Sequence, residues 1–265
     1  MVRADQRSGK TPRPSVWLND RERGGRRGGG QPSGLDRDRI TEATVRLLDA
    51  EGLERFSMRR LAAELDVTAM SVYWYVDTKD DLLELALDRA FGELALPEAD
   101  SGADSGADSG ADWRDELRAL ARAYRALLVR HSWLPALVGR FLNIGPQALR
   151  FSGAVQRVLG RTGLPEHEVT GAIAAVFQFV YGHGTVEGHF RDRVASTGLT
   201  ADEYHHRAMT EVLRHPDASD VIGRSARIME ARGGDTVEEM LERDFTFALD
   251  LLVAGIEAMV ARGRG

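Results

Sequence analysis

The chain has 265 residues, of which 43% are hydrophobic and 29% are charged, and its formal net charge is −6. It contains no cysteine, so a disulfide framework and a thiolate metal site are both excluded. No uninterrupted apolar run approaches the roughly 18 residues that span a bilayer, and the polar, Arg-rich start lacks the apolar core of a signal peptide. We therefore expect a cytoplasmic protein with no membrane partner and enough apolar residues for two domains.

The first 35 residues are predicted to form a disordered basic arm. Residues 1–39 hold ten Arg or Lys against five acids, in a segment rich in Gly and Pro. Such an arm either follows DNA phosphates or the minor groove, or it is a solvated and dispensable tail. Trp17 and Leu18 are unusual in this composition and indicate a docking point.

Residues 36–96 carry four helical patterns in succession. Asp36 is a suitable cap for a first helix whose apolar residues recur at i, i+3, i+4 and i+7. Ser57 caps a second helix that ends before Asp66, and Thr78 opens the fourth helix as the first residue of a capping box. The spacing predicts a small domain in which the third segment lies between two well-defined helices.

The third segment begins at Thr68 and is only about eight residues long, roughly 12 Å, so it must be held by its neighbours. Val72 and Val76, four residues apart, are the residues expected to dock it. A helical wheel then turns Met70, Ser71, Tyr73 and Trp74 outward, with Tyr75 near the boundary. Tyr and Trp displayed together indicate a surface that contacts another molecule; the alternative is that they pack against the first helix as core.

From Ile40 to about Leu94, above all in the run SVYWYVDTKDDLLELAL, the sequence resembles the DNA-binding domain of the TetR family of bacterial transcription regulators. The resemblance implies a helix-turn-helix whose third helix meets the DNA groove. Asp66 stands where the family usually has Gly, a replacement that a left-handed backbone tolerates. The DNA-contacting residues implied by the resemblance are Arg59, Thr68, Ala69, Met70, Ser71, Tyr73, Trp74, Tyr75 and Lys79.

Lys79 also draws notice without the resemblance. It is one of only two lysines in the chain, the other being Lys10. A lysine at a helix N-terminus gains nothing from the helix dipole, so a nearby anion such as a phosphate explains it better than helix stability does.

Residues 97–112 are predicted to be a flexible acidic linker, because the repeat DSGADSGADSGAD has no apolar face to bury. From 113 to 265 the pattern is helical again. The predicted helices run over 115–130, 146–160, 165 to about 187, and 236 to about 261, and capping boxes are expected at 200–203 and 236–239.

The last helix has two apolar lines, which favours one face for the core and one for a partner. The first line holds Val237, Met240, Leu241, Ala248, Leu251, Leu252, Ile256 and Met259, and the second holds Phe245, Leu249 and Val253. We expect a homodimer built on this helix and the 165–187 helix, with core packing of both lines as the alternative. Paired subunits would place two recognition helices about one DNA turn apart, roughly 34–36 Å.

The resemblance further implies a small-molecule effector that binds the C-terminal domain and shifts the fourth helix. Candidate pocket residues are Trp133, Phe141, Asn143, Phe151, Phe177, Gln178 and Tyr181. His183, Glu187 and His189 suggest metal ligation, but only the first two share a helical face, so we predict no metal site and no cofactor.

The prediction is therefore an all-α protein with an N-terminal three-helix helix-turn-helix domain (36–96) and a larger C-terminal helical domain (113–265) for effector binding and dimerisation. We expect a nucleoid-associated repressor that binds a palindromic double-stranded operator as a homodimer and is released by a small molecule. The alternative is a DNA-binding regulator without an effector, whose C-terminal domain serves only dimerisation or a protein partner. An enzyme is not expected, because no Walker loop, G-x-G-x-x-G or H-E-x-x-H motif occurs.

Overall fold

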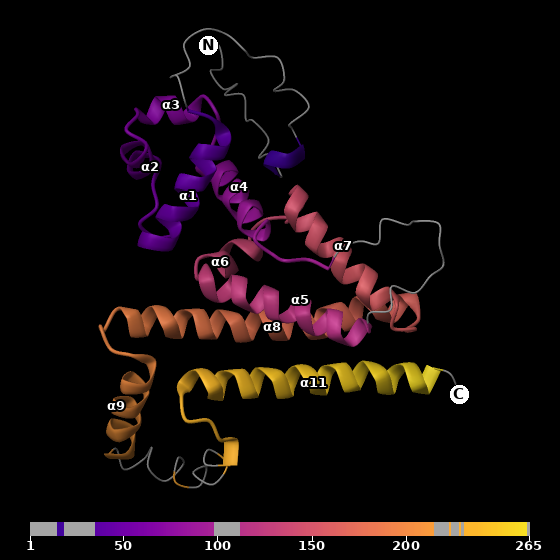
Figure 1. Cartoon of the computed structure of the whole chain (residues 1–265). Coiled ribbons are helices and arrows are strands. Elements are labelled where there is room, and N and C mark those ends of the chain that lie inside the picture. The colour runs from indigo at the N-terminus through magenta and orange to yellow at the C-terminus, as the bar shows by residue number, and fades with distance from the viewer. Residues whose placement is uncertain are drawn as a thin grey trace, which may run out of the picture. The chain divides into compact units, whose positions relative to one another are not determined.

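The computed structural model describes residues 15–18, 35–97, 112–214 and 231–263, together with the single positions 223 and 228. Within these ranges every regular element is a helix and none is a strand, which confirms the predicted fold class (Figure 1). The rest of the predicted arm and most of the predicted linker lie outside the described residues. Internal contacts define an N-terminal unit, Met1–Gly92 with Ala136–Leu149, and a C-terminal unit, Glu93–Pro135 with Arg150–Gly265.

The first two helices of the N-terminal unit begin where their caps predict. Helix α1 (Arg37–Glu51) starts after Asp36, whose carboxylate accepts the Arg39 N–H at 2.7 Å. Helix α2 (Met58–Glu64) starts after Ser57, whose hydroxyl accepts the Arg60 N–H at 3.2 Å. The predicted apolar stripe of α1 is buried throughout, namely Ile40, Ala43, Thr44, Leu47 and Leu48.

The turn after α2 and the short helix that follows carry the unusual backbone of this unit. Asp66 has a φ of 53°, so it adopts the left-handed conformation expected of a residue in a glycine position. Helix α3 (Ala69–Tyr73) is shorter than the roughly eight residues predicted, because the N–H groups of Tyr75 and Val76 both donate to the Val72 carbonyl and tighten the end of the helix. Val72 and Val76 are buried, as predicted, and anchor α3.

Helix α4 (Lys79–Phe91) packs along α1 and carries three buried carboxylates. The predicted capping box is present: the Thr78 hydroxyl accepts the Asp81 N–H at 3.0 Å, and the Asp81 carboxylate accepts the Thr78 N–H at 3.3 Å. The other two buried carboxylates, Glu84 and Asp88, lie one turn apart on α4.

Asp88 joins α4 to the start of helix α7 (Pro146–Gly160). Its carboxylate accepts the backbone N–H groups of Gln147 at 3.0 Å and Ala148 at 2.9 Å, two donors that a helix leaves unpaired in its first turn. Burial raises the pKa of Asp88 above its ordinary value, although these two donors lower it. Gly145 passes so close that a Cβ atom there would lie 2.2 Å from Asp88 Oδ1.

In the C-terminal unit, helix α5 (Trp113–Arg130) packs along helix α8 (Glu166–Ala195), and helix α11 (Val237–Gly263) lies antiparallel to α8 (Figure 1). Helix α6 (Leu134–Val138) is short, and helix α9 (Ala201–Arg214) follows α8. The predicted capping box at the start of α9 is confirmed, because Thr200 and Glu203 exchange their backbone and side-chain hydrogen bonds.

Helix α8 extends to Ala195, so the predicted end near Glu187 was wrong. The low helix propensity of the glycines at 182, 184 and 188 predicts an end of the helix there, but two of these glycines serve helix packing. A Cβ at Gly184 would lie 3.0 Å from the Leu128 side chain, and one at Gly188 would lie 3.2 Å from the Leu128 carbonyl oxygen. These glycines let α5 approach α8 closely, and the packing offsets their low helix propensity.

The second apolar line of α11 is buried, and the first is divided: Val237 and Ile256 are buried, but other members reach the surface. Phe245, Leu249 and Val253 are buried, while Leu251 and Met259 of the other line are exposed. Helix α8 is also apolar: one 18-residue window has a mean hydropathy of 1.2, which by length and composition alone suffices to cross a membrane. A search for an uninterrupted apolar run does not find this window, because isolated polar residues interrupt it while the mean hydropathy stays high. Only 17% of the window is buried within one chain.

Candidate nucleic-acid interface and C-terminal cavity

Helix α3 displays large apolar side chains to solvent. Met70 is 69% exposed, Trp74 is 72% exposed and Tyr73 is 44% exposed, on a helix whose Val72 is completely buried. The Thr68 hydroxyl accepts the Ser71 N–H at 3.2 Å and lies 2.9 Å from the Ser71 hydroxyl, so polar groups open the helix. Apolar surface of this kind on so short a helix is a binding surface rather than core.

Tyr75 differs from the two aromatic residues before it. It is half-buried, and its hydroxyl donates to the Leu35 carbonyl at 2.6 Å, just before α1. The bond ties the end of α3 to the start of α1. It explains the three consecutive aromatics: two face outward, and the third fixes the segment to the domain.

The two cations among the predicted DNA contacts have different surroundings. Arg59 is exposed, and the described residues give it no hydrogen-bond or ion-pair partner. Lys79 is half-buried; its Nζ donates to the Phe56 carbonyl at 2.8 Å and lies 5.3 Å from the centre of the Phe56 ring. No local feature of the sequence indicates this intradomain partner, which supplies a structural reason for a cation at the start of α4.

The seven predicted pocket residues are divided between the two units. Phe141 and Asn143 belong to the N-terminal unit, where the Asn143 amide donates to the carbonyls of Val138 and Phe141. The other five belong to the C-terminal unit. There Trp133 is buried against His131, the Tyr181 hydroxyl donates to the Pro135 carbonyl, and Gln178 is exposed.

Two of the seven come together with a residue that the pocket prediction omitted. Phe151 and Phe177 meet edge to face at 5.5 Å between ring centres, and Tyr124 lies 5.2 Å from Phe151 and 6.1 Å from Phe177. Burial raises the pKa of the Tyr124 phenol well above its ordinary value. We call these three residues the aromatic cluster.

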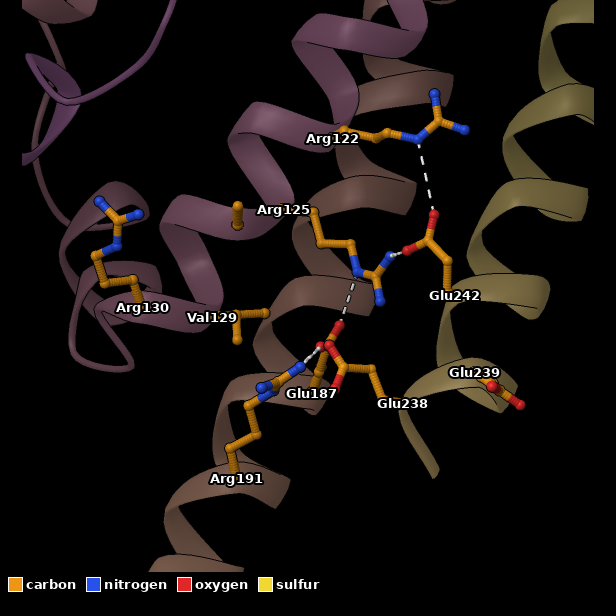
Figure 2. A pocket seen from close by; sticks show the side chains of 10 residues that line it. Arg122, Arg125, Val129, Arg130, Glu187, Arg191, Glu238, Glu239 and Glu242 are labelled. Carbon is orange, nitrogen blue, oxygen red and sulfur yellow. Dashed lines mark hydrogen bonds and ion pairs between the residues drawn. The ribbon is translucent and has the colours of Figure 1, made fainter. Parts of the chain in front are cut away.

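A cavity of about 590 Å³ lies elsewhere in the C-terminal unit, among α5, α8 and α11 (Figure 2). Arginines on α5 and α8 face glutamates on α8 and α11 across it (Figure 2). None of the predicted pocket residues lines it. Its lining consists of Arg122, Arg125, Ala126, Val129, Arg130, Glu187, Arg191, Glu238, Glu239 and Glu242.

Arg125 is the centre of this charged cavity. Its Nε donates to Glu187 at 2.7 Å, another of its nitrogens pairs with Glu242, and its guanidinium lies 4.4 Å from the centre of the Phe245 ring. Glu187 also accepts from Arg191 at 2.9 Å. Burial alone would raise the pKa of Glu242, but the hydrogen bond and the charge of Arg125 hold that pKa below its ordinary value. A cation shared by carboxylates on two helices joins α5, α8 and α11.

His183 lies beside this network, with Nδ1 at 3.8 Å from Glu187. Burial lowers the pKa of His183, and the positive charge of Arg125 lowers it further. His189, the third candidate metal ligand of the sequence, is exposed. Across the described ranges no group of three or more His, Asp or Glu side chains has the arrangement of a metal site.

Known protein families match both parts of the chain. Residues 40–86 match the model for bacterial regulatory proteins of the tetR family, and residues 106–260 match that for the tetracyclin repressor-like C-terminal domain. The chain belongs to the TetR family. The TetR assignment makes α1 to α4 a helix-turn-helix DNA-binding domain, followed by a helical C-terminal domain.

Relatives within the TetR family cover most of the chain. An HTH-type transcriptional regulator of Saccharopolyspora erythraea is 36% identical over 224 residues, 84% of this chain and 85% of the relative. The HTH-type transcriptional repressor DrrR1 of Streptomyces coeruleorubidus is 35% identical over 231 residues, 87% of this chain and 80% of the relative. These relatives are regulators of transcription, and this TetR protein is a DNA-binding transcriptional regulator.

A solved TetR family structure shares the fold. ActR of Streptomyces coelicolor, in complex with actinorhodin, has a TM-score of 0.64 and 23% sequence identity, and the match covers 86% of this chain and 97% of ActR. At this identity the likeness speaks for the fold alone.

Proposed function

We propose that this TetR family protein is a cytoplasmic, nucleoid-associated repressor that binds a palindromic operator as a homodimer and leaves it when a small molecule binds the C-terminal domain. The observation that carries the proposal is the outer face of α3, where Met70, Tyr73 and Trp74 are exposed on a helix held by buried valines. In a major groove such side chains contact thymine methyl groups and base edges.

Four further predicted contacts, namely Thr68, Ser71, Arg59 and Lys79, are assigned to the DNA backbone. The hydroxyls of Thr68 and Ser71 lie at the start of α3, where phosphate contacts fix the register of a recognition helix. Arg59 is free to reach a phosphate. Lys79 has two further N–H donors beyond the one held by Phe56, and these supply its phosphate contact.

A second copy of the chain is the proposed cover of the apolar face of α8 and α11. A groove of about 560 Å³ runs between these helices, and small residues on both sides allow close approach. Leu251 is 64% exposed at this groove, and the apolar window of α8 is largely uncovered in one chain. The groove is lined by Leu164, Glu168, Gly171, Ala172, Ala175, Leu251, Leu252, Gly255, Ile256 and Met259.

Dimerisation is tested by the mass of the protein in solution. Light scattering on the full chain should give the mass of two copies. Leu251→Glu should shift the measured mass toward that of one copy, because burying a carboxylate in the interface carries a large desolvation cost. Leu142→Glu is the matched control, since Leu142 is 58% exposed in the N-terminal unit. A monomeric wild-type protein, or a dimer unaffected by Leu251→Glu, would contradict the interface.

The proposed effector is an apolar, ring-containing small molecule that contacts the aromatic cluster. Phe151 and Phe177 are half-buried and already arranged for ring contacts. ActR has been solved with actinorhodin bound, which illustrates ligand binding on this fold. The second candidate is a regulator without an effector. It is favoured by the charged cavity, where Arg125 and Arg191 are already engaged with Glu187 and Glu242.

Thermal-shift screening of the full chain distinguishes these two candidates. A ring-containing compound that raises the Tm should lose its effect in Phe177→Ala and keep it in Phe190→Ala, which truncates another half-buried ring of α8. A compound whose shift is the same in both variants does not use the aromatic cluster. A broad panel with no stabilising compound would favour the second candidate.

Selection of genomic DNA fragments by the purified full-length protein tests operator binding. The bound fragments should share an inverted repeat with half-sites one DNA turn apart, about 10–10.5 base pairs between centres, or a multiple of it. Fragments with no common sequence, or with a single unpaired half-site, would contradict the proposal.

A further inference from the structure

The segment Ser15–Leu18 packs against α4 in the N-terminal unit, although α4 lies more than 60 residues later in the chain. Ser15 and Val16 are buried, and Val16 to Leu18 form a single helical turn. The Ser15 hydroxyl donates to Glu84 Oε1, and the Val16 N–H donates to Glu84 Oε2 at 2.8 Å. The Trp17 N–H then donates to the Ser15 hydroxyl oxygen at 3.1 Å. Each oxygen of one carboxylate therefore has its own donor.

Glu84 is only 4% exposed, and the described residues offer its carboxylate no donor other than these two. A buried carboxylate without a partner is strongly unfavourable, so the segment can cover Glu84 because it supplies these two donors. The donors come from a residue pair that opens a helical turn, a geometry suited to an anion. Glu84 is thus a receptor for this segment rather than an ordinary surface acid.

The segment also contacts α1, and through α1 it is connected to α3. The Arg37 guanidinium, in the first turn of α1, lies 5.7 Å from the centre of the Trp17 ring. Leu35, two residues earlier, is where the Tyr75 hydroxyl binds. The same chain of contacts therefore runs from Glu84 on α4, through the start of α1, to the end of the recognition helix.

We propose that residues 15–18 form a clasp, that Glu84 is its receptor on α4, and that docking of the clasp holds α1 and α4 in the arrangement that presents α3 to DNA. The clasp gives a purpose to Trp17, which the composition of the arm does not explain, whereas Leu18 is 57% exposed and has no part in the docking. The proposal requires only the family's DNA binding, and it is independent of the effector and of the dimer interface.

A double-mutant cycle in the full-length protein tests the docking. Ser15→Ala with Val16→Pro removes both donors, because proline has no N–H and its fixed φ suits the first position of a helical turn. Glu84→Gln keeps the shape but places an amide donor against one of the clasp donors. Each change should lower the Tm by about 4–8 °C or more, the range for a domain of this size that loses one such interaction.

The decisive quantity is the coupling between the two changes. With both clasp donors removed, Glu84→Gln should cost less than half of its effect in the wild-type background, because the donor conflict is gone and a neutral side chain is easier to bury. Equal Tm losses in the two backgrounds would overturn the proposal. So would a Tm within about 1 °C of wild type for the Ser15→Ala, Val16→Pro variant.

The DNA half of the proposal needs its own measurement and control. On the operator fragment selected by the wild-type protein, Val16→Pro should weaken binding about tenfold at a temperature where the variant is folded. Leu18→Ala, in the same segment but 57% exposed, should bind like wild type. A Val16→Pro variant with lowered Tm and unchanged affinity would overturn the role in DNA presentation. If no operator is found, the proposed function fails, and the Tm cycle still decides whether the clasp docks on Glu84.

Discussion

Replacing Arg125 with Met removes the cation that three helices of the C-terminal unit share. The Arg125 side chain is 10% exposed and Glu187 is 3% exposed, so the change leaves a buried carboxylate with fewer partners. Breaking a buried ion pair from one side costs about 3–5 kcal/mol. The lower end applies here, because Arg191 still donates to Glu187 at 2.9 Å. For a unit of this size, about 3 kcal/mol corresponds to a Tm loss of about 6–12 °C.

Arg118→Met is the matched control, on the same face of α5 two turns earlier. Arg118 pairs with Asp250 at 2.8 Å, but Asp250 is 48% exposed, so the loss should be about 0–1 kcal/mol. Differential scanning calorimetry on both variants measures the contrast. Adding Glu187→Leu to Arg125→Met should recover most of the loss, because an apolar pair can replace a buried ion pair at little cost. Equal Tm values for Arg125→Met and Arg118→Met, or no recovery in the double variant, would refute the reasoning.

Three further predictions concern single residues. Lys79→Ala should lower the affinity for every DNA sequence and reduce the slope of log K against log salt concentration by about one phosphate contact. An unaltered slope in a salt titration would show that Lys79 contacts the Phe56 carbonyl and no phosphate. Gly145→Ala should lower the Tm, because the overlap of its methyl group with Asp88 costs about 1–3 kcal/mol of stability. Gly153→Ala is the control: the space around Gly153 is open, so its Tm should be equal to that of the wild type or higher. The reverse order of the two Tm values would contradict the packing. Folding lowers the pKa of His183, so its contribution to stability is complete above about pH 6.5 and is lost as the pH falls below that value. His183→Gln should therefore reduce the change in Tm between pH 7.5 and 5.5, measured by scanning fluorimetry. Parallel curves of Tm against pH for the variant and the wild type would contradict this role.

The helices of the N-terminal unit were predictable because local rules set them. Asp36, Ser57 and Thr78 are caps whose side chains each accept the N–H of the residue three positions later, and such bonds follow from sequence spacing. Val72 and Val76 were predictable as anchors because they are four residues apart and therefore share one face of a helix. The family resemblance then supplied the role of the helix, which spacing alone does not give.

The contacts that sequence reasoning missed join residues far apart in the chain. Nothing near Lys79 in the sequence points to the Phe56 carbonyl, and nothing near Glu84 points to Ser15 and Val16. The predicted end of α8 was wrong for the same reason: Gly188 is explained only by the neighbouring helix. Long-range partners depend on how the helices pack, which one sequence does not determine.

The pairing of charges around the cavity has a counterpart in the sequence pattern. Arginines recur along one side of α5, and acids recur along α11 at intervals of about two turns. In the structure they pair in opposite chain order, as expected for antiparallel helices: Arg114 with Glu257, Arg118 with Asp250, and Arg122 with Glu242. Opposite charges recurring along two predicted helices therefore indicate that the helices pair, although they do not set an exact register, because the arginines are one turn apart and the acids about two turns apart.

The central claim is that the outer face of α3 contacts base pairs, and operator affinity measures it most directly. On the selected operator, Tyr73→Ala and Trp74→Ala should each weaken binding of the full-length protein by about 1–3 kcal/mol, which is roughly 5- to 150-fold. Trp113→Ala, which truncates a tryptophan at the start of α5, should leave the affinity unchanged. Wild-type affinity in both α3 variants would contradict the account.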